Sequence, residues 1–162
     1  MAIPKISRMF IAVLGVVSSS AYAGSLGGVT VGQPLSEAQR ILAAQGPVRQ
    51  LSAQVLSAGD YIVIGCAGRV WGITRALDPS FRTFTTEVAQ TNLELSRQAS
   101  AKALNDNGTK KTHGIMLEWL LPDGTTRSLS YAEVGSSISV SQGLNRTKFC
   151  GSGTTGSGII PH

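Results

Sequence analysis

Residues 114–121 read Gly-Ile-Met-Leu-Glu-Trp-Leu-Leu, and this stretch carries the clearest strand pattern in the chain. Its side chains divide by a two-residue alternation into Ile115, Leu117, Trp119 and Leu121 on one side and Met116, Glu118 and Leu120 on the other. Both sides are apolar except at Glu118, and such a strand is covered on both faces. The pattern therefore predicts a central strand of a sheet.

Turn and strand signals continue on both sides of this stretch. Residues 122–124 (Pro-Asp-Gly) predict a turn, because glycine accepts the positive φ that many turns require. Residues 127–131 and 138–141 then predict two more strands, which gives a three-stranded meander. Further upstream, residues 61–64 and 70–74 are rich in β-branched and aromatic side chains and flank a Cys-Ala-Gly-Arg turn, which predicts a hairpin.

Two segments show helical spacing. Residues 34–46 begin with Pro34, which suits a first helical turn, and stop at Gly46 and Pro47. Residues 85–104 favour a second helix, with its apolar residues on one stripe. The predicted fold class is therefore α+β: a single domain in which two helices pack on an antiparallel sheet of about four to five strands.

The beginning of the chain has the order of a secretory signal. Lys5 and Arg8 precede an apolar run at 9–17, and Ala21-Tyr22-Ala23 provides a small-residue cleavage site, so residues 1–23 are predicted to be a cleavable signal peptide. The run is shorter than the roughly 20 residues of a transmembrane helix. We expect a periplasmic or secreted protein without stable membrane insertion.

Cleavage would leave an α+β domain at residues 24–150 and a tail at 151–162. The tail is rich in Gly, Ser and Thr and is predicted to be flexible. The chain is 42% hydrophobic and 14% charged, which suits a folded core. Its 14 basic residues only modestly exceed its 9 acidic ones, so no nucleic-acid partner is expected.

The cysteines, Cys66 and Cys150, both lie in the predicted mature chain. Export to an oxidising compartment makes a disulfide between them the expected state. A second interpretation makes Cys66 a nucleophile with His113 as its base, since a thiol needs a neighbouring imidazole to become a thiolate. The predicted hairpin turn around Cys66 offers no helix N-terminus that would lower the pKa of its thiol, so the disulfide is favoured.

Residues 29–46, followed by the segment Arg69-Val70-Trp71-Gly72-Ile73, resemble small exported domains of the SmpA/OmlA and β-lactamase-inhibitor-protein type. The matching positions are Gly32, Glu37, Ala38, Leu42, Gly46, Gly68, Val70 and Ile73. The resemblance implies an α+β unit that binds other proteins or helps to assemble the outer membrane, with no catalytic residues to carry over. Two departures are that Pro34 replaces the usual capping Ser or Thr, and that no lipidated N-terminal Cys is present.

The candidate protein-binding residues are Arg69, Trp71 and Arg75. They would alternate on one face of the second hairpin strand, and aromatic and cationic side chains are common interface anchors. Alternatively, Trp71 packs in the core beneath a helix and the arginines are ordinary surface charges. No metal or other cofactor is expected, because the histidines are only His113 and His162.

These observations favour a non-enzymatic exported module that binds an unidentified protein partner or assists envelope assembly. The alternative is a small exported hydrolase that uses Cys66 or Glu118. Glu118 is the acidic residue within 114–121, the stretch with the clearest strand pattern. If it has no catalytic role, it would face solvent or pair with Arg127 across a hairpin. The sequence leaves the oligomeric state open.

Overall fold

The computed structural model describes residues 24–106 and 112–146. The predicted signal peptide, the predicted tail and Cys150 therefore lie outside the described residues. The elements, in chain order, are β1 (Ser25–Leu26), β2 (Val29–Thr30), α1 (Leu35–Ala43), β3 (Arg49–Ser52), β4 (Val55–Ala58), β5 (Tyr61–Cys66), β6 (Arg69–Leu77), α2 (Phe81–Leu95), β7 (Ser100–Asp106), β8 (Thr112–Leu120), β9 (Thr125–Val134) and β10 (Ser137–Arg146).

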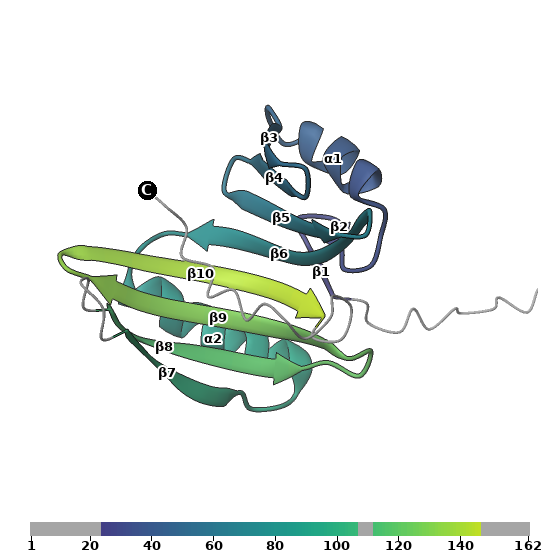
Figure 1. Cartoon of the computed structure of the whole chain (residues 1–162). Helices are drawn as coiled ribbons and strands as arrows, with labels where there is room; N and C mark the ends of the chain where they lie inside the picture. The colour runs from purple at the N-terminus through teal and green to yellow at the C-terminus, as the bar shows by residue number, and fades with distance from the viewer. Residues whose placement is uncertain (1–23, 107–111, 147–162) are drawn as a thin grey trace, which may run out of the picture.

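The main sheet is antiparallel and has eight strands in the order β3-β4-β5-β6-β10-β9-β8-β7 (Figure 1). This order reflects an internal repeat in which a helix followed by four strands occurs twice along the chain. The last strand of each repeat, β6 or β10, lies at the centre of the sheet, and the first, β3 or β7, lies at an edge. The two repeats join where β6 pairs with β10, and β1 and β2 form a separate two-stranded sheet.

Both helices cover the same face of the main sheet. One row of paired residues crosses five strands in the order Val63, Ile73, Leu144, Arg127 and Trp119. Paired residues of adjacent strands share a face. The first three belong to the core cluster that includes α1, and Trp119 belongs to the cluster that includes α2. We call this side the helix-bearing face; Figure 1 shows α2 behind strands β8 and β9.

The predicted helix at 34–46 is confirmed as α1. Pro34 is the N-cap residue, so it precedes the first turn instead of occupying it. Glu37 lies in that first turn, where the helix dipole favours a carboxylate. Ala38 and Leu42 are one turn apart and fully buried, which fixes the face that α1 presents to the sheet.

The second helix is shorter than its predicted span of 85–104 and begins earlier. The Ser80 hydroxyl accepts a hydrogen bond from the Thr83 backbone N–H at 3.1 Å, so Ser80 caps a helix that begins at Phe81. It ends before Ser96, whose φ of 50° is left-handed. Residues 100–106 form β7 against β8 instead, because strand pairing outweighs their modest helical propensity.

The predicted α+β arrangement of two helices on four to five strands is wrong. The described chain is mostly β, with an eight-stranded sheet and a second sheet of two strands. The sequence patterns missed β3 and β4, and they assigned β7 to a helix. The hairpin at 61–74 and the meander at 114–141 were predicted correctly and correspond to β5–β6 and β8–β10.

At Gly114 the backbone of β9 leaves no room for a side chain on β8, which leads to a stability prediction. A Cβ at Gly114 would overlap the carbonyl oxygen of Tyr131, whereas the nearest heavy atom to a Cβ at Gly72 is 3.5 Å away. We expect Gly114→Ala to lower the free energy of unfolding by about 1–3 kcal/mol, since the strands must shift. The matched variant Gly72→Ala should change it by less than about 0.5 kcal/mol. Equal urea midpoints for the two variants would contradict this packing.

Candidate functional site

None of the described elements covers the face of the main sheet that points away from the helices. We call it the open face. Strand register assigns to it Ile62, Ile64, Thr74, Ala76, Gly114, Met116, Glu118, Leu120, Thr126, Ser128, Ser130, Ala132, Ser139, Ser141 and Gly143.

Small side chains occupy the centre of the open face, over β6, β10 and β9. Gly143 lies between Thr74 and Ser128, and a Cβ there would lie 2.7 Å from the Ser128 hydroxyl oxygen. The hydroxyl oxygens of Ser130 and Ser141 are hydrogen-bonded at 2.7 Å across β9 and β10. These hydroxyls satisfy one another, and the absence of bulky groups lets a partner approach the backbone closely.

Aliphatic side chains flank this small-residue centre on both sides. Ile62 and Ile64 project from β5, and Met116 and Leu120 project from β8. Ile62, Ile64 and Met116 are half-buried, and Leu120 is 63% exposed. A water-facing side of an antiparallel sheet is normally polar, so aliphatic groups on this face mark it as a candidate interaction surface.

Glu118 forms an ion pair near the β7 side of the open face. Its carboxylate lies 2.5 Å from the Lys102 ammonium, and the Glu118 side chain is 21% exposed. Glu118 thus lies on the water-facing side of the sheet, as one predicted alternative had it, whereas the alternative of a bond to Arg127 is incorrect. Arg127 pairs instead with Glu94 of α2 at 2.8 Å, on the helix-bearing face.

The structure separates the three predicted binding residues. The pairing of β5 with β6 shifts register between Ile64 and Gly65, and Trp71 is the extra residue of this bulge. The shift puts Arg69, opposite Cys66, on the open face and Arg75, opposite Tyr61, on the helix-bearing face. The prediction that all three share one face is therefore wrong, because alternation does not continue through a bulge.

Each of these three side chains has a local environment of its own. The Arg69 guanidinium donates to the Gly32 carbonyl at 2.9 Å, and the Arg75 guanidinium lies 5.6 Å from the centre of the Tyr61 ring. Trp71 is half-buried and belongs to neither core cluster. Its buried indole N–H donates to no described acceptor. The interpretation of Trp71 as a core residue beneath a helix is not supported, and a binding role stays a prediction.

Cys66 and His113 lie in different parts of the sheet. Cys66 ends β5 and His113 lies near the start of β8, with β6, β10 and β9 between those two strands. Four strand spacings amount to roughly 19 Å. A thiol and an imidazole must be within hydrogen-bond reach to act as a dyad, so this pair cannot form one.

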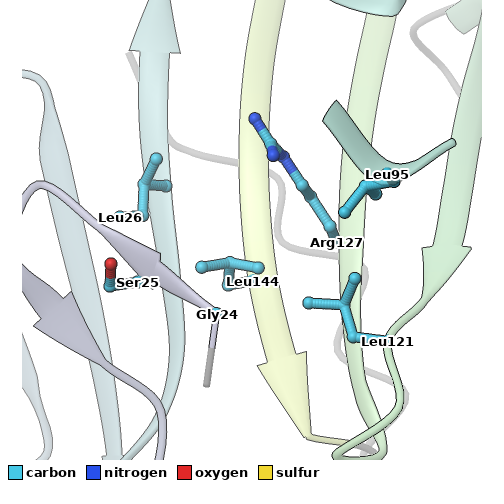
Figure 2. A pocket seen from close by; sticks show the side chains of 7 residues that line it. All are labelled: Gly24, Ser25, Leu26, Leu95, Leu121, Arg127 and Leu144. Carbon is cyan, nitrogen blue, oxygen red and sulfur yellow. The ribbon is translucent and has the colours of Figure 1, made fainter. Parts of the chain in front are cut away.

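The helix-bearing face contains a small pocket between the two core clusters (Figure 2). Four leucines, Leu26, Leu95, Leu121 and Leu144, line it together with Gly24, Ser25 and Arg127. Its volume of about 180 Å³ is below the roughly 300–1,000 Å³ of sites for cofactors and drug-sized ligands. The lining pairs no nucleophile with a general base, since its hydroxyl, that of Ser25, has no His, Asp or Glu beside it among the lining residues, so the pocket suits a small, mostly apolar group.

Arg127, the charged side chain at this pocket, is engaged within the chain. Besides its ion pair with Glu94, its Nε and Nη2 donate to the side-chain oxygen of Gln142 at 3.1 and 2.6 Å when the Gln142 amide is assigned the orientation that satisfies both groups. Gln142 is 5% exposed. These contacts tie α2 to the two strands β9 and β10 and compensate the charge, which indicates a structural role for Arg127.

The described residues contain no group of three or more His, Cys, Asp or Glu side chains placed to hold a metal ion. Neither α1 nor α2 has the length and apolar character needed to cross a membrane. Comparisons with protein-family models, curated proteins and solved structures gave no match. The likeness to SmpA/OmlA and β-lactamase-inhibitor-protein domains therefore stays a prediction from the motif residues.

Proposed function

We propose that this protein is a non-enzymatic, exported module that binds another protein through the open face of its eight-stranded sheet. The partner is a folded protein that contacts the hydroxyl-bearing centre and the aliphatic flanks at the same time. Through such binding the protein would act as an accessory factor in envelope assembly. The proposal includes cleavage after Ala23 and a periplasmic or secreted location.

The open face is the single observation that carries this proposal. Both helices pack against the opposite face, so the sheet offers a wide rigid surface that no described element covers. Its aliphatic flanks, Ile62 and Ile64 on one side and Met116 and Leu120 on the other, supply apolar area that binding would remove from water. Rigid strands hold these groups in place, which lowers the entropic cost of association.

The alternative of an exported hydrolase receives no support from the geometry. Cys66 has no imidazole from His113 within reach, because three strands separate them. Glu118 is held by the Lys102 ammonium, and it projects from the sheet face opposite to the one on which His113 lies. No described observation favours this second function.

Photo-crosslinking tests the binding role of the open face. A benzoylphenylalanine at position Thr74 would sit at the centre of this face, and the same group at Gln39 would sit on the exposed surface of α1. In an extract of the native host's envelope, we expect the derivative at Thr74 to give one adduct of defined mass and the derivative at Gln39 to give none. Excess unmodified protein should abolish the adduct by competition.

Two outcomes would contradict the proposal. The first is equal crosslinking from Thr74 and Gln39, since specific docking uses one face. The second is no adduct from Thr74, Ser128 or Met116, which together sample the open face on β6, β9 and β8. Circular dichroism of each derivative serves as the control for folding.

A further inference from the structure

An aromatic cluster lies at the N-terminal end of α2, on the helix-bearing face. The ring centres of Phe81, Phe84 and Tyr131 are separated by 5.5 to 6.0 Å, and the rings of Phe81 and Tyr131 meet edge to face. Phe84 is 5% exposed and belongs to the core, whereas Phe81 is 60% exposed. An aromatic side chain this exposed adds little to the core but is well suited to anchor an interface.

The exposed apolar surface continues from these rings along the β9–β10 hairpin. Glu133 lies two residues beyond Tyr131 on the same face of β9, which places its Cα roughly 7 Å further along the strand. Ile138 is directly opposite Glu133 on β10 and is 42% exposed. Phe81, Tyr131, Glu133 and Ile138 together form what we call the aromatic patch.

Glu133 brings a negative charge to the aromatic patch. One carboxylate oxygen accepts a hydrogen bond from the Tyr131 hydroxyl at 2.6 Å. This hydrogen bond, together with burial and the charge of Glu133, raises the pKa of Tyr131 above its usual 10.0. Glu37, Glu94 and Glu118 each pair with a basic side chain of the chain, but Glu133 joins no ion pair among the described residues.

We propose that the aromatic patch docks a lysine or arginine side chain of a polypeptide partner, with an adjacent aliphatic residue covering Phe81 and Ile138. A cation is attracted by the face of an aromatic ring, and the Glu133 carboxylate supplies the opposite charge beside it. The patch lies on the opposite face from the open face, so this surface is independent of the proposed function.

The probe for this proposal is the peptide acetyl-Leu-Arg-Leu-amide, titrated into the ¹⁵N-labelled mature protein. We expect the backbone amide signals of Phe81, Tyr131, Glu133 and Ile138 to shift together. The peptide with norleucine in place of arginine should bind about five-fold more weakly, because it has the aliphatic part without the charge. The peptide with glutamate in that place should not bind.

Glu133→Gln should reduce the affinity for the arginine peptide about five-fold, to that of the norleucine peptide. The matched variant Glu87→Gln, on α2 and outside the patch, should bind like the original protein. Equal affinities for all three peptides would overturn the proposal, as would an unchanged affinity in Glu133→Gln. A concentration-dependent dimer that dissociates in Phe81→Ala would also overturn it, since a second copy would then be the occupant.

Discussion

Replacing Trp119 with alanine is expected to lower the free energy of unfolding by about 3–5 kcal/mol. Trp119 is 1% exposed and packs with Phe84, Leu129 and Val140 beneath α2. Its indole N–H also donates to the Asn92 side-chain oxygen at 2.9 Å. The substitution leaves a large cavity and an amide without its donor, and chemical denaturation followed by circular dichroism measures the loss.

Two comparison variants separate the contributions of Trp119. Asn92→Ala removes the hydrogen bond and leaves the ring in place, so it should cost only about 1 kcal/mol. Trp71→Ala removes the half-buried tryptophan outside both core clusters, and its effect should be clearly smaller than that of Trp119→Ala. A larger loss from Trp71→Ala would mean that the core has been assigned to the wrong tryptophan.

Replacing Cys66 and Cys150 together with serine is expected to destabilise the protein by up to about 4 kcal/mol without changing its fold. The reason is that a disulfide between them would close a loop over most of the mature chain. The described strands support this pairing, because β10 runs toward the end of β6 that lies beside Cys66. Cys150 lies four positions beyond Arg146 in the sequence, and four steps of extended chain can span up to about 14 Å.

Mass spectrometry of the non-reduced mature protein should show a mass two hydrogens below that of the reduced form. Rapid alkylation of Cys66 at neutral pH without prior reduction would instead indicate a free thiolate and would revive the hydrolase hypothesis. An unchanged thermal midpoint in the double serine variant would show that the pair does not stabilise the fold.

Several elements of the fold were predictable because their signals are local. The alternation at 114–121, the turn at 122–124 and the amphipathic run at 34–46 each correspond to an observed element. The expected disulfide between Cys66 and Cys150 requires the last strand to lie near the first hairpin, and β10 does pair with β6 of that hairpin.

The parts that sequence analysis missed depend on contacts between distant segments. The helix-prone residues 100–106 become a strand because β8 offers them a partner edge. β3 is exposed along its whole length, with Leu51 between polar residues, so it has no alternation of buried and exposed positions. β4 does alternate between half-buried and buried positions, but its four residues are too few to give a strand signal in the sequence. Without these three strands, neither the eight-stranded sheet nor the repeat of one helix and four strands could be inferred.

The candidate site was only partly visible for the same reason. Ser139 and Ser141 alternate with Ile138 and Val140, and this pattern correctly indicated a strand with one apolar side. Nothing in one strand indicates which strands lie beside it, so the assembly of hydroxyl and aliphatic groups on the open face could not be predicted. The bulge at Trp71 similarly moved Arg69 and Arg75 to opposite faces.

The most direct test of the open face as a binding surface is a comparison of affinities for the crosslinked partner, once purified. Thr74→Arg places a long charged side chain at the centre of the open face, and Gln39→Arg places the same charge on the exposed side of α1. Isothermal titration calorimetry should show at least about ten-fold weaker binding for Thr74→Arg, equivalent to a loss of about 1.4 kcal/mol, and unchanged binding for Gln39→Arg. Equal affinities of the two folded variants would contradict the account.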